Sequence, residues 1–258
     1  MLPDMADFAP SLPPDLDGVP SAEGPLPAPS ELVGRPYALP IDILGELHGP
    51  LFYADFSGFR KLYACSVELV EALCDETRFA KNLTPSLARI RPLAGVGLYS
   101  AYHGEPNWQK AHDVLMPGFS YAGLQNYHAA MLDISCQLTA RWDACVGQRP
   151  VDASTDLQKL AMDTVALAGF GARFDSFNYD GLSPIPRSFT AAFAELGKAG
   201  RTTRFDNELA YLRREFDELI EQHRTGKPGD LDDLLYVMLG HNPDGEPVLD
   251  LENVRNQI

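Results

Sequence analysis

The chain has 258 residues, of which 45% are hydrophobic, so it can form one large packed domain or two small ones. Its 36 acidic side chains outnumber 21 basic ones and give a formal net charge of −15 at pH 7. This charge argues against nucleic-acid backbones and anionic membrane surfaces as partners. No apolar run approaches the roughly 20 residues that a membrane-spanning helix needs, so we expect no transmembrane segment.

Residues 1–36 differ in composition from the rest of the chain. Ten of the 21 prolines lie in the first 40 residues, and no lysine or arginine precedes Arg35. Such a segment cannot bury enough apolar surface to offset its ordering entropy, so we expect a disordered leader followed by a folded region over 37–258. The leader lacks the basic start and apolar core of a signal peptide, which predicts a cytoplasmic protein.

The folded region begins with a short helix over 41–49 and a β-hairpin. Two strand-like runs, 51–56 and 60–65, flank the turn dipeptide Ser57-Gly58. After the hairpin, apolar residues at helical spacing predict a mainly α fold with one small β-sheet.

Further helices are predicted over 66–78, 121–145, from a cap at Asp152 or Ser154 to Gly169, 188–196, 205–223, 230–239 and from Asp250 onward. The segment 79–105 is predicted to be irregular. On the helix that ends at Gly169, the inward face is predicted to carry Leu157, Leu160, Ala161, Thr164, Val165 and Ala168. On the helix pair that follows, the apolar faces carry Phe189, Phe193, Phe205, Leu209, Leu212, Phe216 and Ile220.

The stretch from Gly97 to Phe119 carries the most informative pattern. Pro106 can start a helix and Pro117 ends it. Between them, one stripe at spacing i, i+3, i+4, i+7, i+8 contains Trp108, Ala111, His112, Leu115 and Met116. An indole N–H and an imidazole therefore share a face, and both need partners once buried. Either they are core residues with satisfied hydrogen bonds, or they converge on an anionic group of a buried cofactor.

The four cysteines and six histidines show no metal-site pattern. There is no C-x-x-C pairing and no H-x-x-x-H spacing. We expect Cys65, Cys74, Cys136 and Cys145 to be free thiols in a reducing compartment, and we expect no metal ligand.

Four long segments, in order, resemble the cytochrome P-450 superfamily of haem-thiolate monooxygenases. They are CDETRFAKNL (Cys74–Leu83), AGVGLYSAYHGEPNWQKAHDVLMPGFS (Ala94–Ser120), YHAAMLDISCQL (Tyr127–Leu138) and MDTVALAGFGARFDSF (Met162–Phe177). The closer resemblance is to the haem domain of bacterial self-sufficient fatty-acid hydroxylases, which carry a fused diflavin reductase. The similarity extends from about Leu39 to the last residue.

The resemblance implies roles for particular residues. The helix with Trp108 and His112 is similar to the one whose side chains hydrogen-bond a haem propionate. The implied cofactor-binding residues are Lys81, Leu98, Trp108 and His112. The implied substrate-binding residues are Tyr63, Leu87, Leu93, Ala94 and Tyr99.

The hairpin departs from the family pattern at one position. In the resembled hydroxylases, a basic side chain and a tyrosine at the channel mouth often hold the fatty-acid carboxylate. Tyr63 matches the tyrosine, whereas Phe59 stands where the basic residue is expected. Lys61 shares the face of Tyr63 and could substitute. Tyr63 can equally be a cross-strand aromatic.

By the same resemblance, the chain is the N-terminal half of the fold and stops at the start of the long central helix. The segment with the axial cysteine follows that helix in the family, so we expect no catalytic residue in this chain and no activity from it alone. The whole protein would be an NADPH-dependent monooxygenase that hydroxylates fatty acids or similar long apolar molecules with O2. It would use haem, with FAD and FMN supplied by a fused or separate diflavin reductase.

The sequence also allows a second interpretation, in which the protein is not an enzyme. A chain of stacked amphipathic helices can persist as a non-catalytic binding or scaffold protein, or be the product of a pseudogene.

Overall fold

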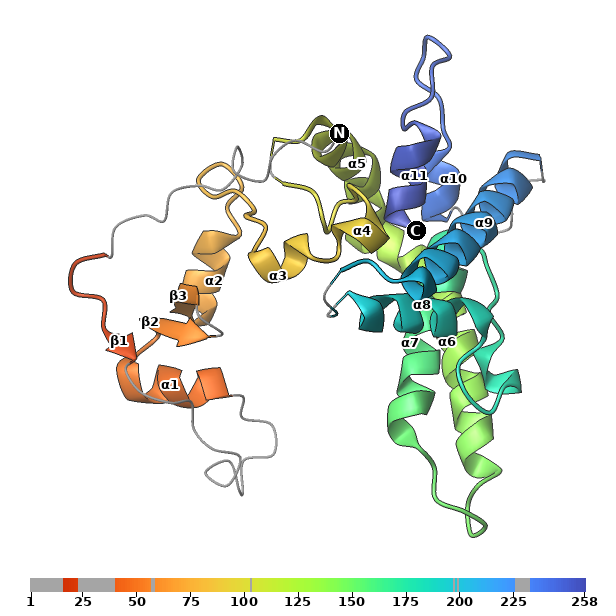
Figure 1. The fold of residues 1–258 in the computed structure, drawn as a ribbon, viewed down its shortest axis with the longest axis horizontal. Helices are drawn as coiled ribbons and strands as arrows, with labels where there is room; N and C mark the ends of the chain where they lie inside the picture. The colour runs from red at the N-terminus through yellow and green to blue at the C-terminus, as the bar shows by residue number, and fades with distance from the viewer. Residues whose placement is uncertain are drawn as a thin grey trace. The chain divides into compact units, whose positions relative to one another are not determined.

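The computed structural model is mainly helical with one small sheet, as the sequence predicts (Figure 1). It describes residues 16–22, 40–56, 59–102, 104–196, 198, 200–225 and 233–258. The chain forms two compact units, 1–81 and 82–258, and each is described by itself.

The first unit is a three-stranded sheet with two short helices. Its elements are β1 (Ser21–Ala22), α1 (Pro40–His48), β2 (Leu51–Phe56), β3 (Phe59–Ala64) and α2 (Val67–Leu73). The strand order is β1-β2-β3, with β1 parallel and β3 antiparallel to β2. The predicted hairpin is therefore confirmed, although its turn, Ser57-Gly58, lies outside the described residues.

Strand β1 lies inside the predicted leader. Ser21 pairs with Tyr53 across the sheet, and the backbone N–H of Leu16 donates to the Tyr53 hydroxyl at 2.9 Å. The prediction of disorder therefore does not hold for 16–22, because the open edge of β2 supplies hydrogen-bond partners for that backbone. The rest of 1–36 lies outside the described residues.

Helix α2 is shorter than the predicted 66–78. Ser66 caps its start, because its hydroxyl accepts from the backbone N–H of Leu69 at 3.3 Å. The helix ends before Asp75, whose carboxylate accepts from both the backbone N–H and the hydroxyl of Thr77. Such a local side-chain turn competes with helix continuation, which explains the early end.

The named elements in the described part of the second unit are helices. They are α3 (Pro85–Ala88), α4 (Arg91–Ala94), α5 (Pro106–Leu115), η3 (Met116–Phe119), α6 (Tyr121–Asp143), α7 (Ala153–Phe170), η4 (Ser176–Asn178), α8 (Pro184–Glu195), α9 (Thr203–Thr225), α10 (Leu234–Met238) and α11 (Leu251–Gln257). The described residues of this unit contain no named strand. The predicted caps at Asp152 and Asp250 are confirmed, since each side chain accepts a backbone N–H of the first turn.

Two short helices correct the prediction for 79–105. Helices α3 and α4 occupy part of this segment, which is therefore not wholly irregular. Helix α4 ends at Gly95, whose φ of +60° suits glycine. A second correction concerns Met116, which is exposed rather than on the buried stripe, because the chain tightens into η3 at that residue.

The core of the second unit is divided among several clusters. The largest joins α5, the end of α7, α9, α10 and α11. A second fills the contact between α8 and α9, and a third lies between α6 and α7. On α8 and α9, the predicted apolar faces are buried at Phe205, Leu209, Leu212 and Ile220, and half-buried at Phe216. Phe189 and Phe193 are exposed instead.

Helix α7 buries a different face from the predicted one. Of the predicted inward residues, Ala168 is buried, but Leu157 and Val165 are 48% and 58% exposed. The buried face carries Lys159 and Asp163 instead. The prediction was wrong because it ranked positions by hydrophobicity, whereas these polar side chains have specific partners and so tolerate burial.

Those partners come from α6 and from the chain around η4. Asp156 on α7 accepts from Arg141 Nε at 2.9 Å and from Trp142 Nε1 at 3.0 Å. Lys159 Nζ donates to the carbonyl oxygen of Tyr179 at 2.6 Å. The α6–α7 contact is thus held by a polar network beside its apolar cluster.

The Asp163 carboxylate is bound by one serine. Asp163 accepts from the backbone N–H of Ser176 at 2.8 Å and from its hydroxyl at 2.6 Å. Burial raises the pKa of Asp163, and the hydrogen bonds from Ser176 oppose that rise.

Candidate functional site

Trp108 and His112 lie side by side on one face of α5. Pro106 occupies the first turn and Glu105 precedes it with extended backbone angles, as a helix start requires. The two rings stack with centroids 4.8 Å apart and planes tilted by 22°. This confirms that the four-residue spacing brings both side chains together. The same helix buries Ala111 and Leu115, so the pair flanks the core.

Both rings are half-buried, and they are donors of a kind that suits an anion. The indole of Trp108 can only donate, and each imidazole nitrogen of His112 donates when the ring is protonated. His112 Nδ1 also lies 3.6 Å from Oδ1 of the exposed Asp113 carboxylate.

An ion pair braces the chain just before α5. Arg91 makes a two-pronged contact with Glu105, with Nη2–Oε1 at 2.9 Å and Nη1–Oε2 at 3.0 Å. Arg91 Nη1 also donates to the carbonyl oxygen of Ser100 at 2.8 Å, and Glu105 Oε2 accepts from the backbone N–H of Tyr102 at 2.8 Å. Both partners are largely buried, which strengthens a charge-assisted pair. Sequence reasoning missed this brace because nothing in local spacing couples Arg91 to Glu105.

The residues predicted to line a substrate pocket contact different clusters. Leu87 packs against Leu83, Ala88 and Tyr102, whereas Leu93 packs against the α8–α9 cluster. Ala94 is half-buried at the end of α4. Of the two residues after Gly97, Leu98 packs on the largest cluster and Tyr99 is 65% exposed. The described residues thus do not gather these side chains around one cavity.

Tyr63 and Lys81 belong to the first unit. Tyr63 stacks on Phe52, its partner across the hairpin, with ring centroids 5.8 Å apart. This is the cross-strand aromatic contact that the sequence left open. Burial and then the nearby Asp55 carboxylate raise the pKa of the Tyr63 hydroxyl. Lys81 is half-buried.

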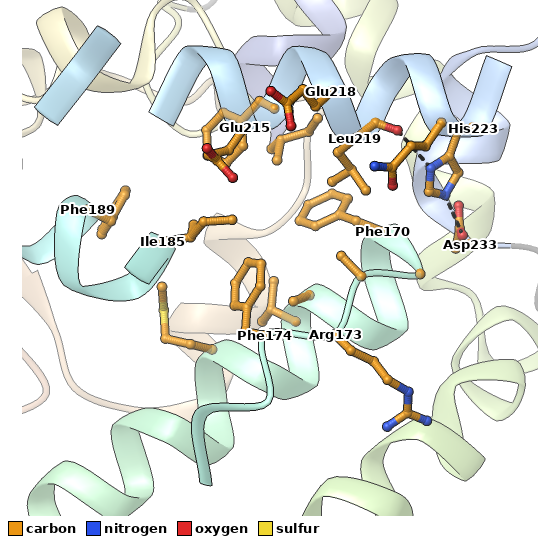
Figure 2. A pocket seen from close by; sticks show the side chains of 18 of the residues that line it. Phe170, Arg173, Phe174, Ile185, Phe189, Glu215, Glu218, Leu219, His223 and Asp233 are labelled. Carbon is orange, nitrogen blue, oxygen red and sulfur yellow. Dashed lines mark hydrogen bonds and ion pairs between the residues drawn. The ribbon is translucent and has the colours of Figure 1, made fainter. Parts of the chain in front are cut away.

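A cavity of 610 Å³ lies between α7, α8, α9 and α10 in the second unit (Figure 2). Figure 2 shows Phe170, Phe174, Ile185 and Leu219 directed toward one another across it, with Arg173 directed away. Glu215 and Glu218 on α9 add carboxylates to the wall. The sequence did not predict this cavity, because its lining comes from helices that are far apart along the chain.

His223 and Asp233 lie at one end of the cavity (Figure 2). His223 Nδ1 lies 3.0 Å from the carbonyl oxygen of Leu219 and Nε2 lies 3.1 Å from Asp233 Oδ2. Asp233 also caps α10, since Oδ1 accepts from the backbone N–H of Tyr236 at 2.8 Å. Gly171 lets this pair approach, because a Cβ there would lie 2.7 Å from Asp233 Oδ2.

Comparison with known proteins identifies the family. The cytochrome P-450 family model matches residues 41–225, which is most of the chain. The chain belongs to the cytochrome P-450 family.

Two of the three relatives described here are named for a P-450 joined to a reductase, and the third is named a self-sufficient P-450 monooxygenase. The chain is 34% identical over 223 residues to bifunctional cytochrome P-450/NADPH–P-450 reductase 2 of Bacillus subtilis, covering 81% of this chain and 21% of that protein. It is 34% identical over 228 residues to the bifunctional enzyme of Bacillus cereus, covering 83% and 21%. It is 30% identical over 257 residues to a self-sufficient cytochrome P-450 monooxygenase of Exserohilum turcicum, covering 91% and 24%. The chain therefore spans about a fifth of the length of these relatives.

The family implies a haem group, and the donor set on α5 fits part of one. A haem carries propionate carboxylates, and the adjacent indole and imidazole of Trp108 and His112 suit a carboxylate at the edge of the core. All four cysteines of this P-450 chain are free thiols, with Cys145 buried and the other three exposed. Within the described residues, no helix is long and apolar enough to cross a membrane.

Proposed function

We propose that this chain is part of a haem-thiolate monooxygenase that hydroxylates fatty acids or similar long apolar molecules. The names of its relatives, which join a P-450 to an NADPH–P-450 reductase or call the protein a self-sufficient monooxygenase, support this class. Electrons would come from NADPH through FAD and FMN in a fused or separate diflavin reductase. The observation that carries the proposal is the stacked Trp108–His112 pair on a helix inside the region that matches the family.

The proposed task of this chain is to bind and orient. Trp108 and His112 hold a haem propionate, with Lys81 and Leu98 at the haem edge. A second set forms substrate contacts: Tyr63, Leu87, Leu93, Ala94 and Tyr99. When bound, haem supplies the oxidation of an unactivated C–H bond with O2. The protein is proposed to work in the cytoplasm.

The first experiment tests the propionate contact in the whole protein. Trp108→Phe and His112→Leu each remove a donor, and a hydrogen bond to a charged group contributes about 1.5–3 kcal/mol. We therefore expect each variant to bind haem roughly tenfold more weakly or worse, because 1.4 kcal/mol corresponds to a factor of ten. Haem affinity is measured from the Soret absorbance during titration of the apoprotein.

Two matched variants control for loss of a ring. Trp142→Phe removes the other tryptophan, which donates to Asp156 away from α5, and His128→Leu changes an exposed histidine on α6. Both should retain haem. Unchanged haem affinity in Trp108→Phe and in His112→Leu would contradict the proposed contact.

A second experiment tests the substrate class. The whole protein, supplied with NADPH, O2 and fatty acids of increasing chain length, should give hydroxylated products in amounts that follow NADPH oxidation. Products from none of the fatty acids, with haem bound, would reject this substrate class while leaving the haem assignment in place.

A third measurement concerns residues 1–258 by themselves. We propose that they do not form a thiolate-ligated haem, because the resemblance places none of Cys65, Cys74, Cys136 and Cys145 in the family's ligand loop. Haem is added to the isolated chain, which is then reduced and exposed to carbon monoxide. A red-shifted Soret band typical of a thiolate-ligated carbonyl would contradict this.

A further inference from the structure

Three hydrogen bonds in series join α11 to Leu98, which lies between Arg91 and Glu105, and to Asn107, which follows Glu105. The backbone N–H of Leu98 donates to Gln257 Oε1 at 2.8 Å. Gln257 Nε2 donates to Asn253 Oδ1 at 2.8 Å, one helical turn back. Asn253 Nδ2 donates to the carbonyl oxygen of Asn107 at 3.4 Å. The contacts span 159 and 146 residues of sequence, so they tie the end of the described chain to the start of α5.

The direction of this series is set by its two ends. Leu98 contributes a backbone donor, and Asn107 contributes a backbone acceptor. Each side chain between them must therefore accept on one side and donate on the other. A primary amide does both, whereas a carboxylate only accepts and an aliphatic side chain does neither. The amides at 253 and 257 therefore suit the pattern, and Asn253 is fully buried, where an unmade hydrogen bond is most costly.

Two glycines bring this loop into direct contact with Asn256 of α11. A Cβ at Gly97 would lie 2.1 Å from the carbonyl oxygen of Asn256, and one at Gly95 would lie 2.0 Å from the Asn256 side-chain oxygen. Either distance is far inside van der Waals contact. The loop that leads to Leu98 is therefore seated on α11 with no room for a side chain between them.

Helix α11 makes further contacts outside the amide series. Asp250 caps it by accepting from the backbone N–H of Asn253 at 2.8 Å. Arg255 Nε donates to Asp217 on α9 at 2.7 Å. These contacts hold one side of α11, and the amide series holds the side that meets α5.

We propose that Asn253 and Gln257 are positioning residues for the face of α5 that carries Trp108 and His112. Asn107 immediately precedes Trp108 in the first turn of the helix. By binding Asn107 at one end and Leu98 at the other, the amide series sets the spacing between α5 and the loop beside it. The cofactor role of that face rests on the proposed function, but the positioning does not.

The experiment uses the fluorescence of Trp108 to report changes around α5. The chain has two tryptophans, so the 1–258 chain carrying Trp142→Phe contains one, and its fluorescence reports the surroundings of α5. Emission maximum and acrylamide quenching are measured well below the unfolding transition. No haem is needed, so failure of the proposed monooxygenase function leaves this test intact.

Three further substitutions in the Trp142→Phe chain test the hydrogen bonds of the amide series separately. Gln257→Leu removes both hydrogen bonds of the glutamine, and Asn253→Asp removes the donor toward Asn107. Both should shift Trp108 emission to the red and increase its quenching. Gln257→Glu keeps the acceptor for Leu98 but cannot donate to Asn253, so a smaller shift in the same direction is expected.

Gln137→Leu is the matched control. Gln137 Nε2 donates to Asp133 four residues earlier, within one helix, so the same chemical change should leave Trp108 unaffected. A lower unfolding temperature with unchanged Trp108 emission in Gln257→Leu and Asn253→Asp would overturn the proposal, since it would mean a purely structural role. Where either variant does not fold, Gln257→Glu decides: an unchanged signal there also overturns it.

Discussion

The α6–α7 and α8–α9 contacts are both made by paired helices, yet they are held in different ways (Figure 1). Helix α9 buries Phe205, Leu209 and Leu212, the positions that its apolar spacing predicts. Helix α7 buries Lys159 and Asp163 and leaves much of its apolar stripe exposed. The difference shows that hydrophobic periodicity identified both helices but identified the buried face only on α9, whereas on α7 a polar network competes for it.

The largest expected effect comes from breaking the polar contact. Asp156→Ala removes the partner of Arg141 and Trp142 and leaves the fully buried Lys159 without its nearest carboxylate, 4.0 Å away. Removing one member of a buried charged network costs about 3–5 kcal/mol. The free energy of unfolding is measured by chemical denaturation of the 1–258 chain.

An exposed ion pair is the matched control for that change. Asp133 pairs with Arg173 on the surface, and removing such an exposed pair changes stability little. Asp133→Ala should therefore be far milder than Asp156→Ala. Equal losses in the two variants would mean that the α6–α7 network contributes no more than a surface pair.

The next largest effect concerns the apolar contact between α8 and α9. Leu212 on α9 is almost fully buried, so Leu212→Ala should lower the free energy of unfolding by about 2–5 kcal/mol through lost burial and a cavity. Leu157→Ala on α7 makes the same chemical change on an exposed apolar stripe and should cost less than about 0.5 kcal/mol. A similar loss at Leu157 would show that the predicted face of α7 is covered in solution.

The smallest effect is a change in pH dependence. Burial raises the pKa of Asp163, so the folded state holds this proton more tightly than the unfolded chain does. The stability that protonated Asp163 contributes is fully present below the pKa that Asp163 has in the unfolded chain. It is lost as the pH rises through the raised pKa that Asp163 has in the folded state. Asp163→Asn stays neutral and can still bond to Ser176. It should therefore lose less stability than the native chain does between about pH 4 and pH 7.

Asp133 should affect the pH dependence of stability in the opposite direction. The hydrogen bond from Arg173, followed by one from Gln137, lowers the pKa of Asp133. Its contribution to stability is present above the unfolded pKa and is lost as pH falls, so Asp133→Asn should change the slope in the opposite direction. Identical pH profiles for the native chain and Asp163→Asn would show that Asp163 titrates alike in the folded and unfolded states.

Much of the fold and part of the candidate site follow from local sequence. The Trp108–His112 pair, the start of α5 at Pro106 and the caps at Asp152 and Asp250 all depend on residues within one or two helical turns of each other. The hairpin and the long helices follow for the same reason. The family resemblance, carried by contiguous segments, is confirmed by the family match over 41–225.

Contacts between residues that are distant in sequence were decided only by the tertiary structure. No helical or strand period relates the positions that these contacts join. They are the Arg91–Glu105 brace, the amide series through Asn253 and Gln257, and the cavity between α7, α8, α9 and α10. The buried face of α7 belongs to the same class. A charged or polar side chain can be buried only if partners meet it, and whether they do depends on how the whole chain folds around it.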